Sequence, residues 1–242
     1  MKAYYHSINT FGTVDGPGIR YLLFLAGCNL GCSFCHNPDT WVRTGKTISV
    51  DEIVEEIKKY RVFYDKSGGG ITVSGGEPLL QAEFVSELFA KCKELGIHTA
   101  LDTGGFFAYS ELDKVLPHTD IVMFSLKAAD EDVHRQLTGK DNALILQNLF
   151  HAASRTQLIL RYVVIPGVND SENSLSKLAD VIKKLPSDTK IDLLPYHTMG
   201  KAKWQMLKIP YKLNTVPDAT KADIQRVKNF FVQAEINNDY VS

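Results

Sequence analysis

Six short apolar runs alternate with longer helix-forming segments along most of the chain, and this alternation limits the possible folds more than any other feature. The first of them, residues 19–25, follows a Gly-Pro-Gly turn as an apolar run, which is typical of a strand buried on both faces of a parallel sheet. Strands that alternate with helices favour right-handed β-α-β units. The predicted strands are 19–25, 71–73, 97–101, 121–126, 158–165 and 190–194.

Six such units are too few to close an eight-unit barrel. The sequence therefore predicts an α/β fold, an open partial (β/α)6 barrel of the TIM type, with parallel strands and outer helices. A length of 242 residues suits one domain spanning 1–242. The predicted helices are 50–60, 81–95, 109–116, 130–137, 142–154, 171–185 and 221–234.

The charge balance argues against several classes of partner. With 27 Lys and Arg against 28 Asp and Glu, the chain has no basic excess for a nucleic acid or a membrane surface. The first residues lack the apolar segment of a signal peptide, and no run reaches the ~20 apolar residues of a membrane span. We therefore expect a monomeric protein of the cytoplasm, where cysteines stay reduced.

Three of the four cysteines lie in one short loop directly after the first predicted strand. The loop, residues 27–37, reads GCNLGCSFCHN and spaces Cys28, Cys32 and Cys35 as C-x3-C-x2-C. Three thiolates at this spacing can each bind one iron of a 4Fe-4S cluster. Cys92 belongs to a helical segment and offers no fourth ligand, so one iron would stay open to an exogenous ligand.

Other interpretations of this loop are weaker. Three cysteines cannot pair completely as disulfides, and the chain shows no secretory context. A structural zinc ion needs four ligands. His36 is a candidate for the fourth, but it is adjacent to Cys35, and neighbouring side chains rarely converge on one small tetrahedral ion.

The cysteine motif followed by His-Asn resembles the radical S-adenosylmethionine (SAM) superfamily, and most closely its activases of glycyl-radical enzymes. The matching segments extend over most of the chain. They are TVDGPGIR (13–20), the cysteine loop with DTW (39–41), SGGG (67–70), SGGE (74–77), GIHT (96–99), LDT (101–103), RYVV (161–164) and LPYH (194–197). The resemblance implies the same open barrel, and in parallel barrels the chemistry lies at the C-terminal ends of the strands.

The resemblance also implies an oxidoreductase that holds a 4Fe-4S cluster and SAM. One electron from the cluster would cleave SAM to methionine and a 5′-deoxyadenosyl radical, which would abstract hydrogen from a glycine of pyruvate formate-lyase. A flavodoxin-type protein would supply the electron. The alternatives are activation of another glycyl-radical enzyme and, in a different class, a non-catalytic scaffold that binds zinc or a cluster.

A glycine pair at the end of the second predicted strand is implied to meet the amino group of SAM. Gly75 and Gly76 would let a ligand approach the backbone, with Glu77 completing the motif. The alternative is an ordinary strand-to-helix turn, where glycine is common.

Five further residues are candidates for the cofactor pocket. The resemblance implies that Phe34 and His36, which flank the last cysteine, pack on the adenine ring, and that Arg161 and His197 contact the cofactor. The alternative for these polar side chains is a structural role, because polar groups at strand ends are often simply hydrogen-bonded to the protein. Lys127 could neutralise an anionic group of the ligand, and the alternative is an ordinary surface lysine.

Two oxygen-bearing residues end the third predicted strand. The resemblance implies that Asp102 and Thr103 help to hold a monovalent cation beside SAM, although both residue types also serve as caps. The family usually presents an aspartate on the next strand, where this chain has Ser125. One negative charge is therefore missing, and we expect weaker cation binding.

Asp15 lies in the loop before the first predicted strand, in the sequence Asp-Gly-Pro-Gly. The resemblance implies that it helps to hold the substrate peptide, whereas the residue types alone fit a turn. Arg20, just after this loop, could serve a buried ion pair.

Overall fold

The computed structural model describes residues 1–236, which form two compact units. The first unit consists of residues 1–29, 40–123 and 155–157. The second consists of residues 30–39, 124–154 and those from 158 onward. The prediction of one domain spanning 1–242 stays a prediction, and its last six residues lie outside the described part of the chain.

Eight strands form the sheet, and their hydrogen-bonded order is β3-β1-β2-β4-β5-β6-β7-β8. β2 pairs in parallel with β4, β4 with β5, and β7 with β8. Because β3 and β8 end the order, the sheet is open, which confirms the predicted class. The strands are β1 (Lys2–Gly12), β2 (Arg20–Leu25), β3 (Thr47–Ser49), β4 (Gly70–Gly75), β5 (His98–Thr103), β6 (Ile121–Ser125), β7 (Gln157–Val164) and β8 (Lys190–Pro195).

The six predicted strands correspond to β2 and to β4 through β8, while β1 and β3 were not predicted. β1 runs antiparallel to both β2 and β3 and shifts register twice along β2. Its sequence, KAYYHSINTFG, interrupts apolar residues with His, Ser and Asn. The extended conformation of β1 therefore depends on its pairing with β2 and β3, and its own sequence pattern is too weak to predict it.

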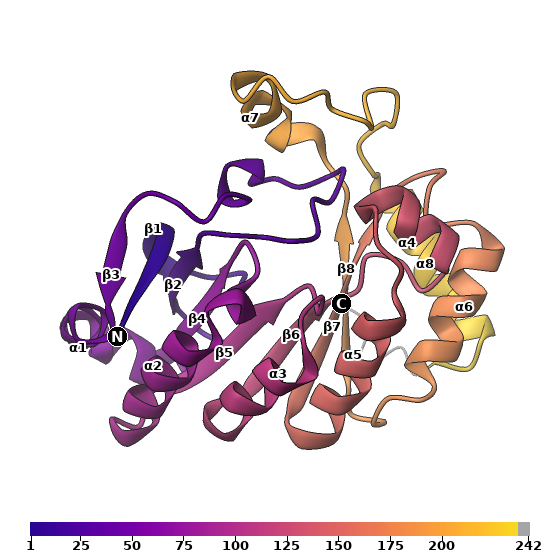
Figure 1. Cartoon of the computed structure of the whole chain (residues 1–242). Coiled ribbons are helices and arrows are strands. Elements are labelled where there is room, and N and C mark those ends of the chain that lie inside the picture. The colour runs from indigo at the N-terminus through magenta and orange to yellow at the C-terminus, as the bar shows by residue number, and fades with distance from the viewer. Residues whose placement is uncertain (237–242) are drawn as a thin grey trace. The chain divides into compact units, whose positions relative to one another are not determined.

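The helices of the first unit follow the predicted alternation and lie along its strands (Figure 1). α1 continues to Ser67, past the predicted end at residue 60. Ser49 and Glu52 form a capping box at its start, and Gly68 ends it in a left-handed conformation. The helices of this unit are α1 (Val50–Ser67), α2 (Ala82–Glu94) and α3 (Tyr109–Val115), with short 3-10 turns at Pro78–Gln81 and Leu116–His118. A further 3-10 turn, Pro38–Thr40, lies where the chain leaves the second unit and re-enters the first.

The second unit carries most of the remaining helices, of which α7 was not predicted. A 3-10 turn, Thr198–Gly200, precedes α7. No helix within residues 1–236 is both long and apolar enough to cross a membrane. The helices are α4 (Glu131–Thr138), α5 (Ala143–Arg155), α6 (Glu172–Ile182), α7 (Lys201–Met206) and α8 (Lys221–Gln233).

Candidate active site at the strand ends

The predicted site residues divide between the two units. The first unit contains Asp15, Cys28, Gly75, Gly76, Glu77, Asp102 and Thr103. The second contains Cys32, Phe34, Cys35, His36, Ser125, Lys127, Arg161 and His197.

Glu77 is the most enclosed acidic side chain of the first unit, at 1% exposure. Its carboxylate accepts hydrogen bonds from the Leu79 backbone N–H at 3.1 Å, from Thr103 Oγ1 at 2.8 Å and from the Gly104 N–H at 2.9 Å. Burial raises the pKa of Glu77 to about 7, against these donors. The side chain therefore braces the turn after β4 against the end of β5.

The glycine pair before Glu77 is required by the chain itself. A Cβ at Gly75 would lie 2.4 Å from the Leu25 nitrogen, and one at Gly76 would lie 2.1 Å from the Gly27 oxygen. The Glu77 N–H also donates to that same Gly27 oxygen at 2.7 Å. This packing fixes the backbone that leads directly into Cys28, and it accounts for both glycines without a ligand.

The predicted cation ligands of β5 have different partners. Asp102 is half-buried, and it accepts a hydrogen bond from Ser74 Oγ at 2.7 Å. Thr103 is buried and donates to Glu77. Sequence reasoning missed Ser74, although it precedes the glycine pair and lies one strand from Asp102.

The loop that carries Asp15 is held by two buried polar side chains. Thr72 Oγ1 donates to the Asp15 carbonyl at 2.7 Å and accepts from Arg20 Nε at 3.0 Å. Arg20 is fully buried and also bonds the Pro17 carbonyl at 3.3 Å and His98 Nδ1 at 3.1 Å. Burial lowers the pKa of Arg20 to about 10, so it stays cationic at neutral pH. Within residues 1–236, the Arg20 guanidinium therefore bonds a hydroxyl, a backbone carbonyl and an imidazole, and not the carboxylate that an ion pair would need.

In the second unit, the end of the cysteine loop is held by backbone contacts. The Cys35 N–H donates to the Cys32 carbonyl at 3.1 Å, and the Asn37 N–H donates to Cys35 Sγ at 3.4 Å. The thiolate is the form of cysteine that binds metal. Trp204 Nε1 donates to the Cys35 carbonyl at 2.8 Å.

The cysteines fit an iron–sulfur cluster in their chemistry. Cys28, Cys32, Cys35 and Cys92 are all free of disulfides. Burial raises the pKa of Cys92 to about 12, which keeps it a thiol. Within residues 1–236, no three His, Cys, Asp or Glu side chains group closely enough to hold one metal ion. A cubane cluster makes no such demand, because each thiolate binds a different iron.

The two predicted histidines of the second unit pack against each other with their rings tilted by 33°. The ring centroids of His36 and His197 are 4.1 Å apart, and His36 Nε2 is 3.2 Å from the His197 carbonyl, to which its N–H donates. Burial lowers the pKa of His36, and the charge of the neighbouring His197 lowers it further, which favours a neutral ring. Phe34 is buried at 7% exposure, with the Lys127 ammonium 5.9 Å from its ring centroid.

Arg161 lies opposite an acidic residue that sequence reasoning missed. Arg161 on β7 is in register with Asp192 on β8, and Arg161 Nε lies 3.5 Å from Asp192 Oδ2. The Arg161 side chain is 12% exposed. Ser125, the last residue of β6, is half-buried. Pairing of β7 with β8 would have been needed to find Asp192.

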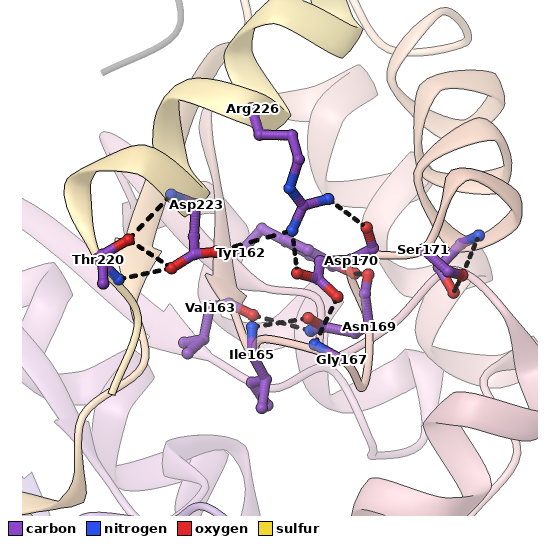
Figure 2. A network of polar contacts seen from close by, with 11 residues as sticks. Tyr162, Val163, Ile165, Gly167, Asn169, Asp170, Ser171, Thr220, Asp223 and Arg226 are labelled. Carbon is purple, nitrogen blue, oxygen red and sulfur yellow. Dashed lines mark hydrogen bonds and ion pairs between the residues drawn. The ribbon is translucent and has the colours of Figure 1, made fainter. Parts of the chain in front are cut away.

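A polar turn after β7 contacts the backbone of Lys127. Asn169 is fully buried. Its Oδ1 accepts from the Ile165 N–H and its Nδ2 donates to the Val163 carbonyl, both at 2.8 Å (Figure 2). The same Nδ2 also donates to the Lys127 carbonyl at 3.3 Å. The next residue, Asp170, forms an ion pair with Arg226 of α8. The hydrogen bond from Asn169 therefore holds the backbone of Lys127 in place.

Comparison with known proteins agrees with this fold and these motifs. Residues 22–179 match the model of the radical SAM superfamily. The fold is similar to that of a radical SAM methyltransferase from Sphaerobacter thermophilus, with a TM-score of 0.65 at 18% identity, over 95% of this chain and 70% of that one. The chain therefore belongs to the radical SAM superfamily.

Its similarity to activating enzymes is closer in sequence. The pyruvate formate-lyase-activating enzyme of Staphylococcus aureus (strain USA300) is 44% identical over 228 residues, which covers 89% of this chain and 90% of the relative. A domain of the pyruvate-formate lyase-activating enzyme from Bacteroides vulgatus ATCC 8482 has a TM-score of 0.58 at 26% identity, over 72% of this chain and 98% of that one.

Proposed function

We propose that this protein activates pyruvate formate-lyase by generating a glycyl radical on it. The observation that carries the proposal is the 44% identity over 89% of the chain to an enzyme with that activity in its name. The three cysteines at C-x3-C-x2-C, none of which is in a disulfide, agree with it. When bound, the cluster and SAM supply reductive cleavage to methionine and a 5′-deoxyadenosyl radical, which takes a hydrogen atom from glycine.

In this proposal each set of residues has a task. Cys28, Cys32 and Cys35 hold the 4Fe-4S cluster and leave one iron for SAM. The backbone at Gly75 and Gly76 receives the amino group of SAM, while the buried Glu77 keeps that backbone in place. The remaining residues that line the SAM pocket are Phe34, His36, Lys127, Arg161 and His197.

Asp15 contacts the substrate peptide in this proposal. Its loop is supported by Thr72 and Arg20. A preformed loop loses less entropy when it binds a partner, which favours the recognition of an extended peptide segment.

Asp102, Thr103 and Ser125 form the proposed site for a monovalent cation. Ser74 and Glu77 already occupy part of the hydrogen-bonding capacity of Asp102 and Thr103. Ser125 adds an oxygen without a charge. We expect Ser125→Asp to increase the stimulation of SAM cleavage by added potassium, measured as the ratio of rates with and without the salt. Equal stimulation in both proteins would contradict this.

The remaining parts of the proposal concern context. The protein acts as a monomeric, single-domain enzyme of the cytoplasm, and a flavodoxin-type protein supplies the electron.

Electron paramagnetic resonance tests the function. The protein is reconstituted anaerobically with iron and sulfide and incubated with SAM, dithionite and pyruvate formate-lyase. A glycyl-radical doublet that disappears with Cys32→Ala is the expected result. If 5′-deoxyadenosine forms without a doublet, the substrate is another molecule. If neither forms on a loaded, reducible cluster, the proposal is wrong.

A further inference from the structure

The segment from Met199 to Lys212, which includes α7, exposes both apolar and basic side chains. Met199 is 81% exposed, Met206 is 77% exposed and Leu207 is 43% exposed. The stretch 198–217 contains four lysines, Lys201, Lys203, Lys208 and Lys212, and no Asp or Glu. In the whole chain, by contrast, the numbers of basic and acidic residues are nearly equal. Lys208 and Lys212 are exposed. We call Met199, Met206, Leu207, Lys208 and Lys212 the α7 surface.

The inner side of the same segment rests on the end of the cysteine loop. A Cβ at Gly200 would lie 2.8 Å from His36 Cα, and Trp204 donates to the Cys35 carbonyl. Lys203 Nζ bonds Asn37 at 2.7 Å and Asp39 at 3.0 Å. Gly200, Lys203 and Trp204 therefore contact the loop, whereas the side chains of Met199 and Met206 are exposed.

The charges around this surface leave its lysines without neutralising neighbours in sequence. Asp39 is engaged by Lys203, and Asp218 accepts the Thr198 N–H at 2.8 Å. An exposed apolar patch with a charged rim is typical of a protein interaction site. Its positive charge selects an acidic partner.

From this arrangement we propose that the α7 surface docks an acidic redox protein that delivers the electron to the cluster. The inference rests on the proposed function. The same segment contacts Cys35 directly, because Trp204 Nε1 donates to the Cys35 carbonyl at 2.8 Å. In the docked pair, one electron passes from the reduced flavin of the partner to the oxidised cluster. The flavin becomes one electron poorer, and no bond forms or breaks.

The test reverses charge at two exposed positions that touch neither the cysteine loop nor the proposed SAM pocket. Holoenzyme carrying Lys208→Glu and Lys212→Glu is titrated with an acidic flavodoxin in its fully reduced state, at low and high salt. Wild-type binding should weaken as salt rises, and the variant should bind about tenfold more weakly or worse. Met206→Glu, in the apolar part, should also weaken binding.

The matched control is Lys183→Glu with Lys184→Glu, which makes the same charge change at exposed residues after α6. It should bind flavodoxin as the wild type does. Radical formation driven by dithionite should stay unchanged in all variants, because a small reductant needs no docking.

Two results would overturn the inference. One is equal flavodoxin binding by the wild type and the α7-surface variants. The other is a parallel loss of dithionite-driven activity, which would assign the surface to pyruvate formate-lyase. Failure of the proposed function itself would look different, since the wild type would then make no radical even with dithionite.

Discussion

Glu77 in the first unit and Cys35 in the second lie at the centres of two differently built regions. Glu77 is enclosed, and its carboxylate accepts from three residues of two neighbouring loops. Cys35 is half-buried, and one indole N–H and one backbone N–H hold its residue in place. The first region is rigid because the chain satisfies its own polar groups. The second exposes apolar side chains, among them Met199 and Met206.

Replacement of a cluster cysteine should have the largest effect on activity. Cys32→Ala removes a ligand that the first region cannot replace, so we expect loss of the cluster and at least a thousandfold loss of SAM cleavage, with iron and sulfide analysis as the measurement. Cys92→Ala is the control, because that thiol is buried in α2. Equal iron loss in both variants would contradict the assignment of ligands.

Glu77→Gln tests the rigidity of the first region. The amide keeps only one acceptor oxygen for three donors, so we expect the free energy of unfolding to fall by about 1–3 kcal/mol. Urea unfolding of the chain, followed by tryptophan fluorescence, measures it. Glu83→Gln is the control, because its carboxylate is exposed and its pairing with Lys114 contributes little.

The pH dependence of the same variant gives a sharper result. The pKa of Glu77 is about 7 in the folded protein against a usual 4.5, so the folded state keeps a proton that the unfolded state releases. Wild-type stability should therefore decline from about pH 4.5 to about pH 7, by up to about 3 kcal/mol. In Glu77→Gln this contribution is absent, and the deficit relative to the wild type should shrink as pH rises. A deficit independent of pH would argue against a raised pKa.

Thr72→Val sharpens the comparison within the first unit. The change keeps the shape but removes the hydroxyl that joins Arg20 to the Asp15 carbonyl. We expect the KM for pyruvate formate-lyase to rise about tenfold while the KM for SAM stays the same, since one lost buried partner costs about 1–2 kcal/mol. Thr72→Ser keeps the hydroxyl and should behave as the wild type. A rise in both KM values would indicate general damage.

Trp204→Phe has the smallest expected effect, on the second region. Phenylalanine keeps an aromatic ring beside Tyr211 but loses the hydrogen bond to the Cys35 carbonyl. A bond worth about 1 kcal/mol should make cluster loss to a chelator about fivefold faster. Tyr211→Phe breaks only the hydroxyl pair with Tyr196 and should change this rate less. If both variants lost iron at the wild-type rate, α7 would not stabilise the loop.

The sequence predicted those parts of the structure that repeat a local pattern. The six parallel strands and most helices follow apolar runs and helical spacing, and the cysteine spacing indicated the cluster. Contacts between distant segments could not be predicted. β1 depends on pairing with β2 and β3, Asp192 on the register of β7 with β8, and α7 on its contact with Cys35. The glycine pair was associated with a ligand, yet chain packing alone requires both residues.

Transfer of deuterium tests the central claim most directly. Pyruvate formate-lyase labelled with deuterium at the alpha carbon of its glycines is incubated anaerobically with the reconstituted protein, SAM and dithionite, and the 5′-deoxyadenosine is analysed by mass spectrometry. The account predicts 5′-deoxyadenosine that carries one deuterium from the labelled substrate. Unlabelled 5′-deoxyadenosine, formed at the same rate with or without pyruvate formate-lyase, would contradict it.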